Sequence, residues 1–195
     1  VIAGLAASLL VTAERGASGL VMDLAGAISG NFAGGSETSP VGTADWTTAL
    51  DAIVDQNVQI VVPLSTDSAV HGLLAAHCNN AALQGYERNC WVGGAGGETK
   101  AQVKARTAGL NTALVSLVAD QYEVDHPNGT TPILEPSYLA LAMAGAQAGS
   151  PVAWPLTRNR LRARNFYQTW APNRDANEMI AGGVVIMTSD TLGWM

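Results

Sequence analysis

The chain has 195 residues, of which 48% are hydrophobic and only 13% are charged. This composition excludes ordinary intrinsic disorder, which combines low hydrophobicity with high charge, and the length allows one large domain or one domain with an appendage. Ten basic and 16 acidic residues give a net charge of -6, so the chain as a whole would repel nucleic acid and anionic lipid. Because charged side chains are so few, the surface must expose much neutral area or cover it with partners, which is a first indication of assembly.

The N-terminal residues 1–30 are rich in Ala and Gly and show no clean period. The apolar stretch 1–11 is too short to span a bilayer and lacks the basic start of a signal peptide. Two cysteines, Cys78 and Cys90, are too few for a disulfide framework and lack metal or redox spacing, so we expect free thiols. The sequence has no initiator Met and stops after a strand-like run, so we expect a fragment of a longer protein.

Regular patterns begin at Asp45, a candidate N-cap for the first helix. Further along, Pro136 and Gly149 bracket an Ala-rich helix, and residues 127–129 spell a turn. The predicted helices are 46–56, 65–83, 98–111, 135–149 and 172–183, and the predicted strands are 58–64, 89–94, 113–120 and 184–188.

The alternation of strands and helices predicts an α/β fold, with a mostly parallel central sheet and helices on both faces. Past Pro151 the character changes, because four arginines fall within seven residues before the last helix and strand. We expect this tail to be the start of a truncated α+β C-terminal subdomain. The predicted domains are an N-terminal segment at 1–30, an α/β core at 31–155 and the C-terminal subdomain at 156–195.

A glycine loop between Gly93 and Gly97 joins a predicted strand to a predicted helix, the setting in which backbone N–H groups bind phosphate. The sequence of this loop departs from the known phosphate-binding motifs, since Glu98 stands after Gly97 where a Walker loop has Lys. A carboxylate at this position would compete with a bound anion. A simple turn is the favoured interpretation. A small α/β enzyme, or a nucleotide-binding or other ligand-binding domain, that uses this loop stays open as the alternative function.

The sequence gives little support for a metal site or a catalytic site. His71 and His77 are six residues apart and do not share one helical face, and Asp67 brings no evident third ligand. His126 lies in a predicted turn, and no G-x-S-x-G elbow occurs. A catalytic triad of Ser, His and Asp can assemble in space from any chain order, but no residue pattern in the sequence indicates one. We therefore predict no catalytic residue, no cofactor and no metal.

An arginine stripe is the most distinctive charged feature. Arg158, Arg160, Arg162 and Arg164 alternate with uncharged residues, so an extended backbone would place all four guanidinium groups on one face. Such a stripe suits bidentate contacts with carboxylates of a partner, and a solvated basic face is the equal alternative. Five of the ten basic residues lie between 158 and 174 in an acidic chain, which favours contacts between copies.

Several segments between Phe32 and Met187 carry a resemblance to a known family through their order and intervals. The segments are FAGGSE, DWTTALDAI, VQIVVPLSTDSAVHGLLAAH, WVGGAGGETKAQVKAR, PILEPSYLALAMAGAQAGSP, PLTRNRL and NEMIAGGVVIM. In these segments the chain resembles the sheath proteins of contractile phage tails, tailocins and related injection machines. The α/β domain of that family is likened to a subtilisin-type fold, but no catalytic triad maps onto this sequence.

The resemblance implies a non-enzymatic structural subunit in hexameric rings, which stack helically around a tail tube and contract to drive it through a cell envelope. Its implied partners are other copies of itself, the tube protein, the baseplate and the tail terminator, without nucleic acid or membrane insertion. Its implied location is the virion tail sheath, after synthesis in the bacterial cytoplasm. The arginine stripe would then contact a neighbouring subunit or the tube. A static shell component is a third possibility.

Overall fold

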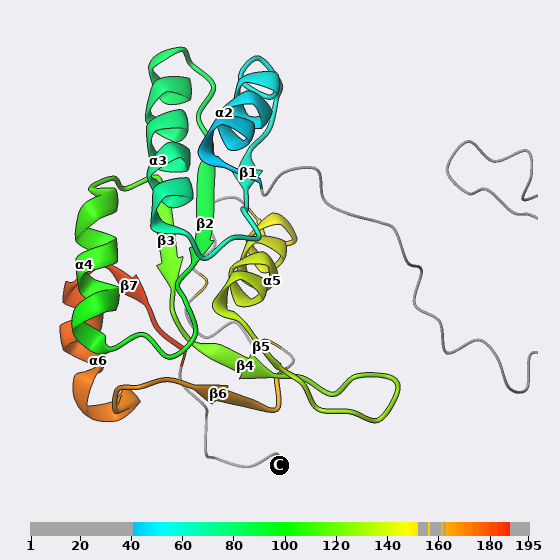
Figure 1. The fold of residues 1–195 in the computed structure, drawn as a ribbon, viewed down its shortest axis with the longest axis vertical. Coiled ribbons are helices and arrows are strands. Elements are labelled where there is room, and N and C mark those ends of the chain that lie inside the picture. The colour runs from blue at the N-terminus through cyan, green and yellow to red at the C-terminus, as the bar shows by residue number, and fades with distance from the viewer. Residues whose placement is uncertain (1–40, 152–155, 157–160, 162, 188–195) are drawn as a thin grey trace, which may run out of the picture. The chain divides into compact units, whose positions relative to one another are not determined.

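The computed structural model describes residues 41–151, 156, 161 and 163–187, which form five helices and seven strands (Figure 1). The helices are α2 (Thr43–Ala52), α3 (Ser68–Leu83), α4 (Lys100–Leu110), α5 (Pro136–Ala148) and α6 (Pro172–Ala181). The strands are β1 (Ile60–Val61), β2 (Asn89–Gly93), β3 (Val115–Val118), β4 (Gln121–Glu123), β5 (Ile133–Leu134), β6 (Asn165–Tyr167) and β7 (Val184–Val185).

The strands form two sheets. The larger sheet is parallel throughout, in the order β1-β2-β3-β7, and the smaller sheet is antiparallel, in the order β5-β4-β6. Strand β7 joins the larger sheet through the pairs Leu117 with Val184 and Val118 with Val185. The described residues beyond 156 therefore contribute one strand to each sheet.

Side chains alternate between the two faces of the parallel sheet along its central strands, so both faces are apolar. Helices cover both of these faces. Cys90 and Val92 of β2 point into a buried cluster with α3, α4 and α6, whereas Trp91 points into a second cluster with α5. Figure 1 shows α3 and α4 on one side of the sheet and α5 on the other. The predicted α/β fold, with a mostly parallel sheet between helices, is confirmed. Both cysteines are buried free thiols.

Local capping explains where the helices begin. Asp67 accepts a hydrogen bond from Ala69 N at 2.9 Å at the start of α3, and Thr99 caps α4. The prediction that Asp45 is the first N-cap is wrong by one turn: the N-cap is Gly42, and Asp45 lies within the first turn, where it accepts from Gly42 N at 2.9 Å. None of these helices is long and apolar enough to cross a membrane.

The short strands depart most from the predictions. The strand predicted at 58–64 is reduced to Ile60–Val61 and is half-buried, because β1 is an edge strand that pairs only with β2. The antiparallel sheet was not predicted at all. The predicted turn at 127–129 lies in the loop that joins β4 to β5, where His126 N donates to Thr130 O at 2.9 Å.

Candidate functional site

The glycine loop lies at the carboxyl end of β2, where it leads into α4. Gly93 allows the start of α5 to approach, since a Cβ at this position would lie 2.1 Å from Ser137 N. Gly97 adopts a left-handed backbone with φ of 78°, which favours glycine. Close packing and one turn therefore explain these two glycines.

Two backbone N–H groups of this loop already donate hydrogen bonds to carboxylates. Ala95 N donates to Glu98 Oε2 at 3.2 Å, and Gly96 N donates to Glu135 Oε2 at 3.0 Å. Arg106 Nε holds the same Glu98 carboxylate at 3.2 Å from Oε1. Because the two N–H groups are satisfied and two acids stand beside them, an incoming phosphate would meet repulsion. The geometry thus disfavours the nucleotide-binding alternative.

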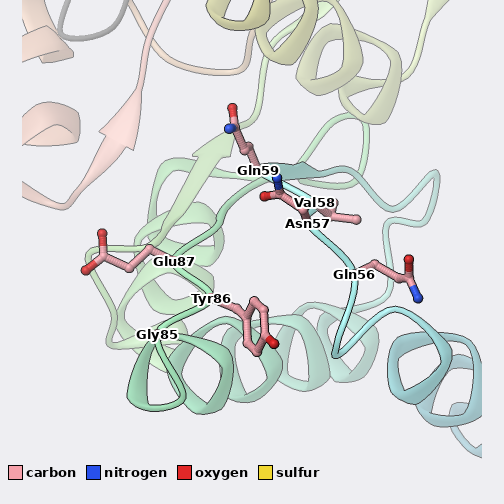
Figure 2. Close-up of a pocket in the computed structure, with 7 residues that line it drawn as sticks. All are labelled: Gln56, Asn57, Val58, Gln59, Gly85, Tyr86 and Glu87. Atoms are coloured by element: carbon pink, nitrogen blue, oxygen red, sulfur yellow. The ribbon is translucent and has the colours of Figure 1, made fainter.

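The surface of the described residues includes two shallow hollows. The larger, of about 280 Å³, lies before the amino ends of β1 and β2 (Figure 2). It is lined by Gln56, Asn57, Val58, Gln59, Gly85, Tyr86 and Glu87. The smaller, of about 220 Å³, lies beside the glycine loop and is lined by Gly97, Glu98, Ala119, Gln121, Tyr167, Gln168, Thr169 and Trp170. Neither lining contains a histidine, cysteine or lysine, and in the smaller hollow the Thr169 hydroxyl donates to the backbone carbonyl of Glu98.

The two helical histidines are each held in separate structural contacts. His71 is fully buried, with Nε2 2.8 Å from Ser65 O and Nδ1 3.5 Å from the Arg106 guanidinium. Burial lowers its pKa, as it does the pKa of His77, whose Nε2 lies 3.0 Å from Arg88 Nη1. Among the described residues, no three His, Cys, Asp or Glu side chains gather as metal ligands.

Only one member of the arginine stripe can be placed. Arg164 lies just before β6 with its side chain 58% exposed, and its Nη1 donates to Asp125 Oδ1 at 3.2 Å. Its Nε lies 3.7 Å from Glu123 Oε1 of β4, so its carboxylate partners come from the same chain. The other three predicted contact residues lie outside the described residues: Arg158, Arg160 and Arg162.

Comparisons with known proteins identify what this chain is similar to. No family model matches it. It is 26% identical over 155 residues to the tail sheath protein of Staphylococcus phage Twort, a match that covers 79% of this chain. The chain resembles tail sheath proteins. This confirms the resemblance stated from the sequence.

The fold agrees with a solved sheath tail protein. The crystal structure of the sheath tail protein from Desulfitobacterium hafniense matches 78% of this chain with a TM-score of 0.58 and 19% sequence identity. The chain spans about a quarter of the length of the Twort sheath protein and about a third of the solved chain, at 26% and 33%.

The two most deeply buried charged residues, Arg88 and Asp120, were not predicted. Arg88 Nη1 donates to Ile53 O at 3.0 Å and its Nη2 donates to Val54 O at 2.9 Å, at the end of α2. Asp120 accepts a hydrogen bond from Met187 N at 2.9 Å, and burial raises its pKa to about 7. The signal for Asp120 was an acid directly after an apolar strand, whereas nothing near Arg88 in sequence indicated its distant carbonyl partners.

Proposed function

We propose that this chain is part of a structural, non-enzymatic subunit of a contractile tail sheath, a component of a virion tail or a related injection machine. The observation that carries the proposal is the sequence match to the Twort tail sheath protein over 155 residues. The fold likeness to the solved sheath tail protein supports it. The carboxylate-filled glycine loop removes the main reason to favour a ligand-binding enzyme.

The proposed subunit assembles with other copies into hexameric rings, which stack helically around a tail tube and contract. Its further partners are the tube protein, the baseplate and the tail terminator. A parallel sheet packed by helices on both faces makes a stiff body that suits subunits moving as units. Contraction then draws its energy from better interfaces in the final state, without nucleotide hydrolysis.

Negative-stain electron microscopy of the gene product that carries this sequence tests the proposal. The protein is expressed alone and concentrated at low and at high salt. We expect hollow striated tubes with six-fold end views. Discrete monomers or dimers under all conditions, including after addition of the tube protein encoded with it, would count against a sheath role.

We further propose that the arginine stripe contacts acidic surface on a neighbouring subunit or on the tube. The exposure of Arg164 supports this, because a guanidinium group paired at the surface can exchange or share its carboxylates. The test is the double reversal Arg160→Glu and Arg162→Glu in the tube-forming protein. We expect assembly to fail, while the single reversal Arg174→Glu on α6 leaves it intact. Normal tubes from the double variant would reject the contact.

A further inference from the structure

Helix α2 is attached to the rest of the fold by little apolar contact. It lies beside α3 (Figure 1), and Leu50 is the only one of its ten residues that is buried. Trp46 and, just after the helix, Ile53 pack partly against the same core cluster. Because burial of apolar surface is the main stabilising contribution to packing, a helix that buries so little depends on polar contacts as well.

Arg88 supplies these polar contacts from the position directly before β2. Its guanidinium donates to the carbonyls of Ile53, Val54 and Gln56, which follow α2, at 3.0, 2.9 and 3.2 Å. Its Nη1 also lies 3.0 Å from Nε2 of His77 on α3. Because Arg88 is 2% exposed, these acceptors stand in for the water that would otherwise solvate its charge.

The contact with Arg88 fixes the protonation state of His77. A guanidinium group only donates hydrogen bonds, so Nε2 of His77 must accept from it. Nε2 therefore carries no proton, and the neutral imidazole holds its proton on Nδ1. A protonated imidazole in the same place would set two donors and two like charges against each other at 3.0 Å.

The surroundings of His77 oppose its positive charge. Burial is the largest influence and the Arg88 guanidinium the next, and together they hold the pKa of His77 below its usual 6.5. Asp51 on α2 acts against them and favours the charged form. Helix α3 itself carries no Asp, Glu, Lys or Arg. His77 is only half-buried, so a proton from the solvent can reach it.

His71 shows a related arrangement without access to solvent. Its Nε2 lies 2.8 Å from the carbonyl of Ser65, so Nε2 donates and Nδ1 faces Arg106 Nη1 at 3.5 Å. His71 is 0% exposed, so a proton reaches it only when the fold opens. Of these two neutral histidines on α3, His77 is therefore the one that can respond to pH in the folded chain.

We propose that His77 is an acid-sensitive release for α2. When Nε2 takes up a proton from the solvent, its hydrogen bond with Arg88 breaks and the imidazolium repels the guanidinium. Arg88 then holds the carbonyls after α2 less firmly, and α2 separates from α3. The proton is the only group transferred, and it returns to the solvent when the pH rises. This inference goes beyond the sheath function and does not depend on it.

Hydrogen exchange of the 195-residue chain measures the release. The protection of the α2 amides, corrected for the intrinsic exchange rate at each pH, is divided by that of α5, which contains no histidine. The released state binds the proton with an ordinary pKa and the docked state excludes it, so acid favours release. Between about pH 7.5 and about pH 5 we expect this ratio to fall by at least about fivefold and at most about thirtyfold. An unchanged ratio would overturn the proposal.

Three variants show whether His77 causes the change. His77→Gln keeps an acceptor for Arg88 but does not titrate, so we expect full protection of α2 at both pH values. His77→Arg carries a permanent charge and no acceptor, so we expect low protection at both. His126→Gln is the matched control, because His126 lies in the β4–β5 loop, and it should keep the acid response of the wild type. A fall in protection that persists in His77→Gln would reject the role of His77.

A measurement on the wild type keeps the proposal testable if circular dichroism shows that His77→Gln does not fold. NMR titration follows the protonation of the His77 imidazole directly. Protonation over the same pH range in which α2 loses protection would support the release. An imidazole that stays neutral while α2 is released would overturn it.

Discussion

At the scale of single residues, the fold raises the pKa of the buried Asp120 carboxyl strongly. Its side chain is fully buried, Oδ2 accepts from Met187 N at 2.9 Å, and Oδ1 has no partner among the described residues. Burial favours the neutral acid, which raises the pKa from 3.8 to about 7. The native chain therefore holds a proton at Asp120 over a pH range in which the unfolded chain has released it.

We expect the free energy of unfolding to fall as pH rises from about 4 to about 7, because the native state binds more protons than the unfolded state in this window. The shift corresponds to at most about 4 kcal/mol at Asp120. Asp120→Asn removes this titration, so the variant should gain stability relative to wild type across the same window. Urea unfolding of both proteins at several pH values measures the difference. Parallel stability curves would show that Asp120 does not titrate as described.

Gly93 is the residue at which the fold tolerates a side chain least. A Cβ there would lie 2.1 Å from Ser137 N and 2.3 Å from Pro136 C, both backbone atoms of α5. We expect Gly93→Ala to lower the free energy of unfolding by at least about 2 kcal/mol, since α5 must move away from β2. Gly109→Ala is the control, because nothing lies within 4 Å of its Cβ and a helical alanine should stabilise by up to about 1 kcal/mol. Equal stability of the two variants in urea unfolding would refute this reasoning.

At the scale of elements, Arg88 holds α2 onto the sheet. Its guanidinium donates to three carbonyls at the end of α2, those of Ile53, Val54 and Gln56, and it is 2% exposed. Ile53 O and Gln56 O also accept from backbone N–H groups, so removal of the guanidinium takes one bond from each of them and leaves Val54 O without its side-chain donor.

We expect Arg88→Ala to lower the free energy of unfolding by about 3 kcal/mol and to expose the amides of α2 to hydrogen exchange before those of α5. Arg174→Ala is the control, because the Arg174 side chain is 81% exposed and its ion pair with Asp175 should contribute at most about 1 kcal/mol. Uniform protection of α2 and α5 in the Arg88 variant would show that α2 is held by its apolar face alone.

Elements with strong local signals could be predicted, and those that depend on distant pairing could not. Helices α3 and α5 were predicted within a few residues, because a run of capping residues at 65–67 and Pro136 mark their starts. Strands β4 and β6 have three residues each, and they exist through pairs such as Glu123 with Asn165, far apart in sequence. No periodicity can develop over three residues, so sequence analysis had no signal for this sheet.

The candidate sites, too, were predictable in their local sequence features and not in their contacts with distant residues. The spelling of the glycine loop already argued against phosphate, but the decisive carboxylate of Glu135 comes from the segment before α5 and is visible only in the fold. The alternation of arginines predicted a common face. It could not predict that Arg164 meets Asp125 of the β4–β5 loop, because that hairpin was itself not predicted.

At the scale of the whole molecule, charge decides how copies can approach. Each chain carries -6, so two copies repel over the screening length, which falls from about 30 Å at about 0.01 M salt to about 3 Å at about 1 M. Contact through the proposed arginine stripe would consist of ion pairs, which salt also screens. Salt should therefore weaken an association that the arginine stripe holds.

We expect self-association through the arginine stripe to weaken between about 0.01 M and about 1 M sodium chloride, because screening reduces the attraction of its ion pairs. Sedimentation velocity at matched protein concentrations measures this as a fall in the weight-average sedimentation coefficient. Arg160→Glu together with Arg162→Glu should abolish the fall, since the new acids repel the carboxylates of the partner. If association instead strengthens with salt, and the double reversal makes no difference, the arginine stripe does not hold the copies together.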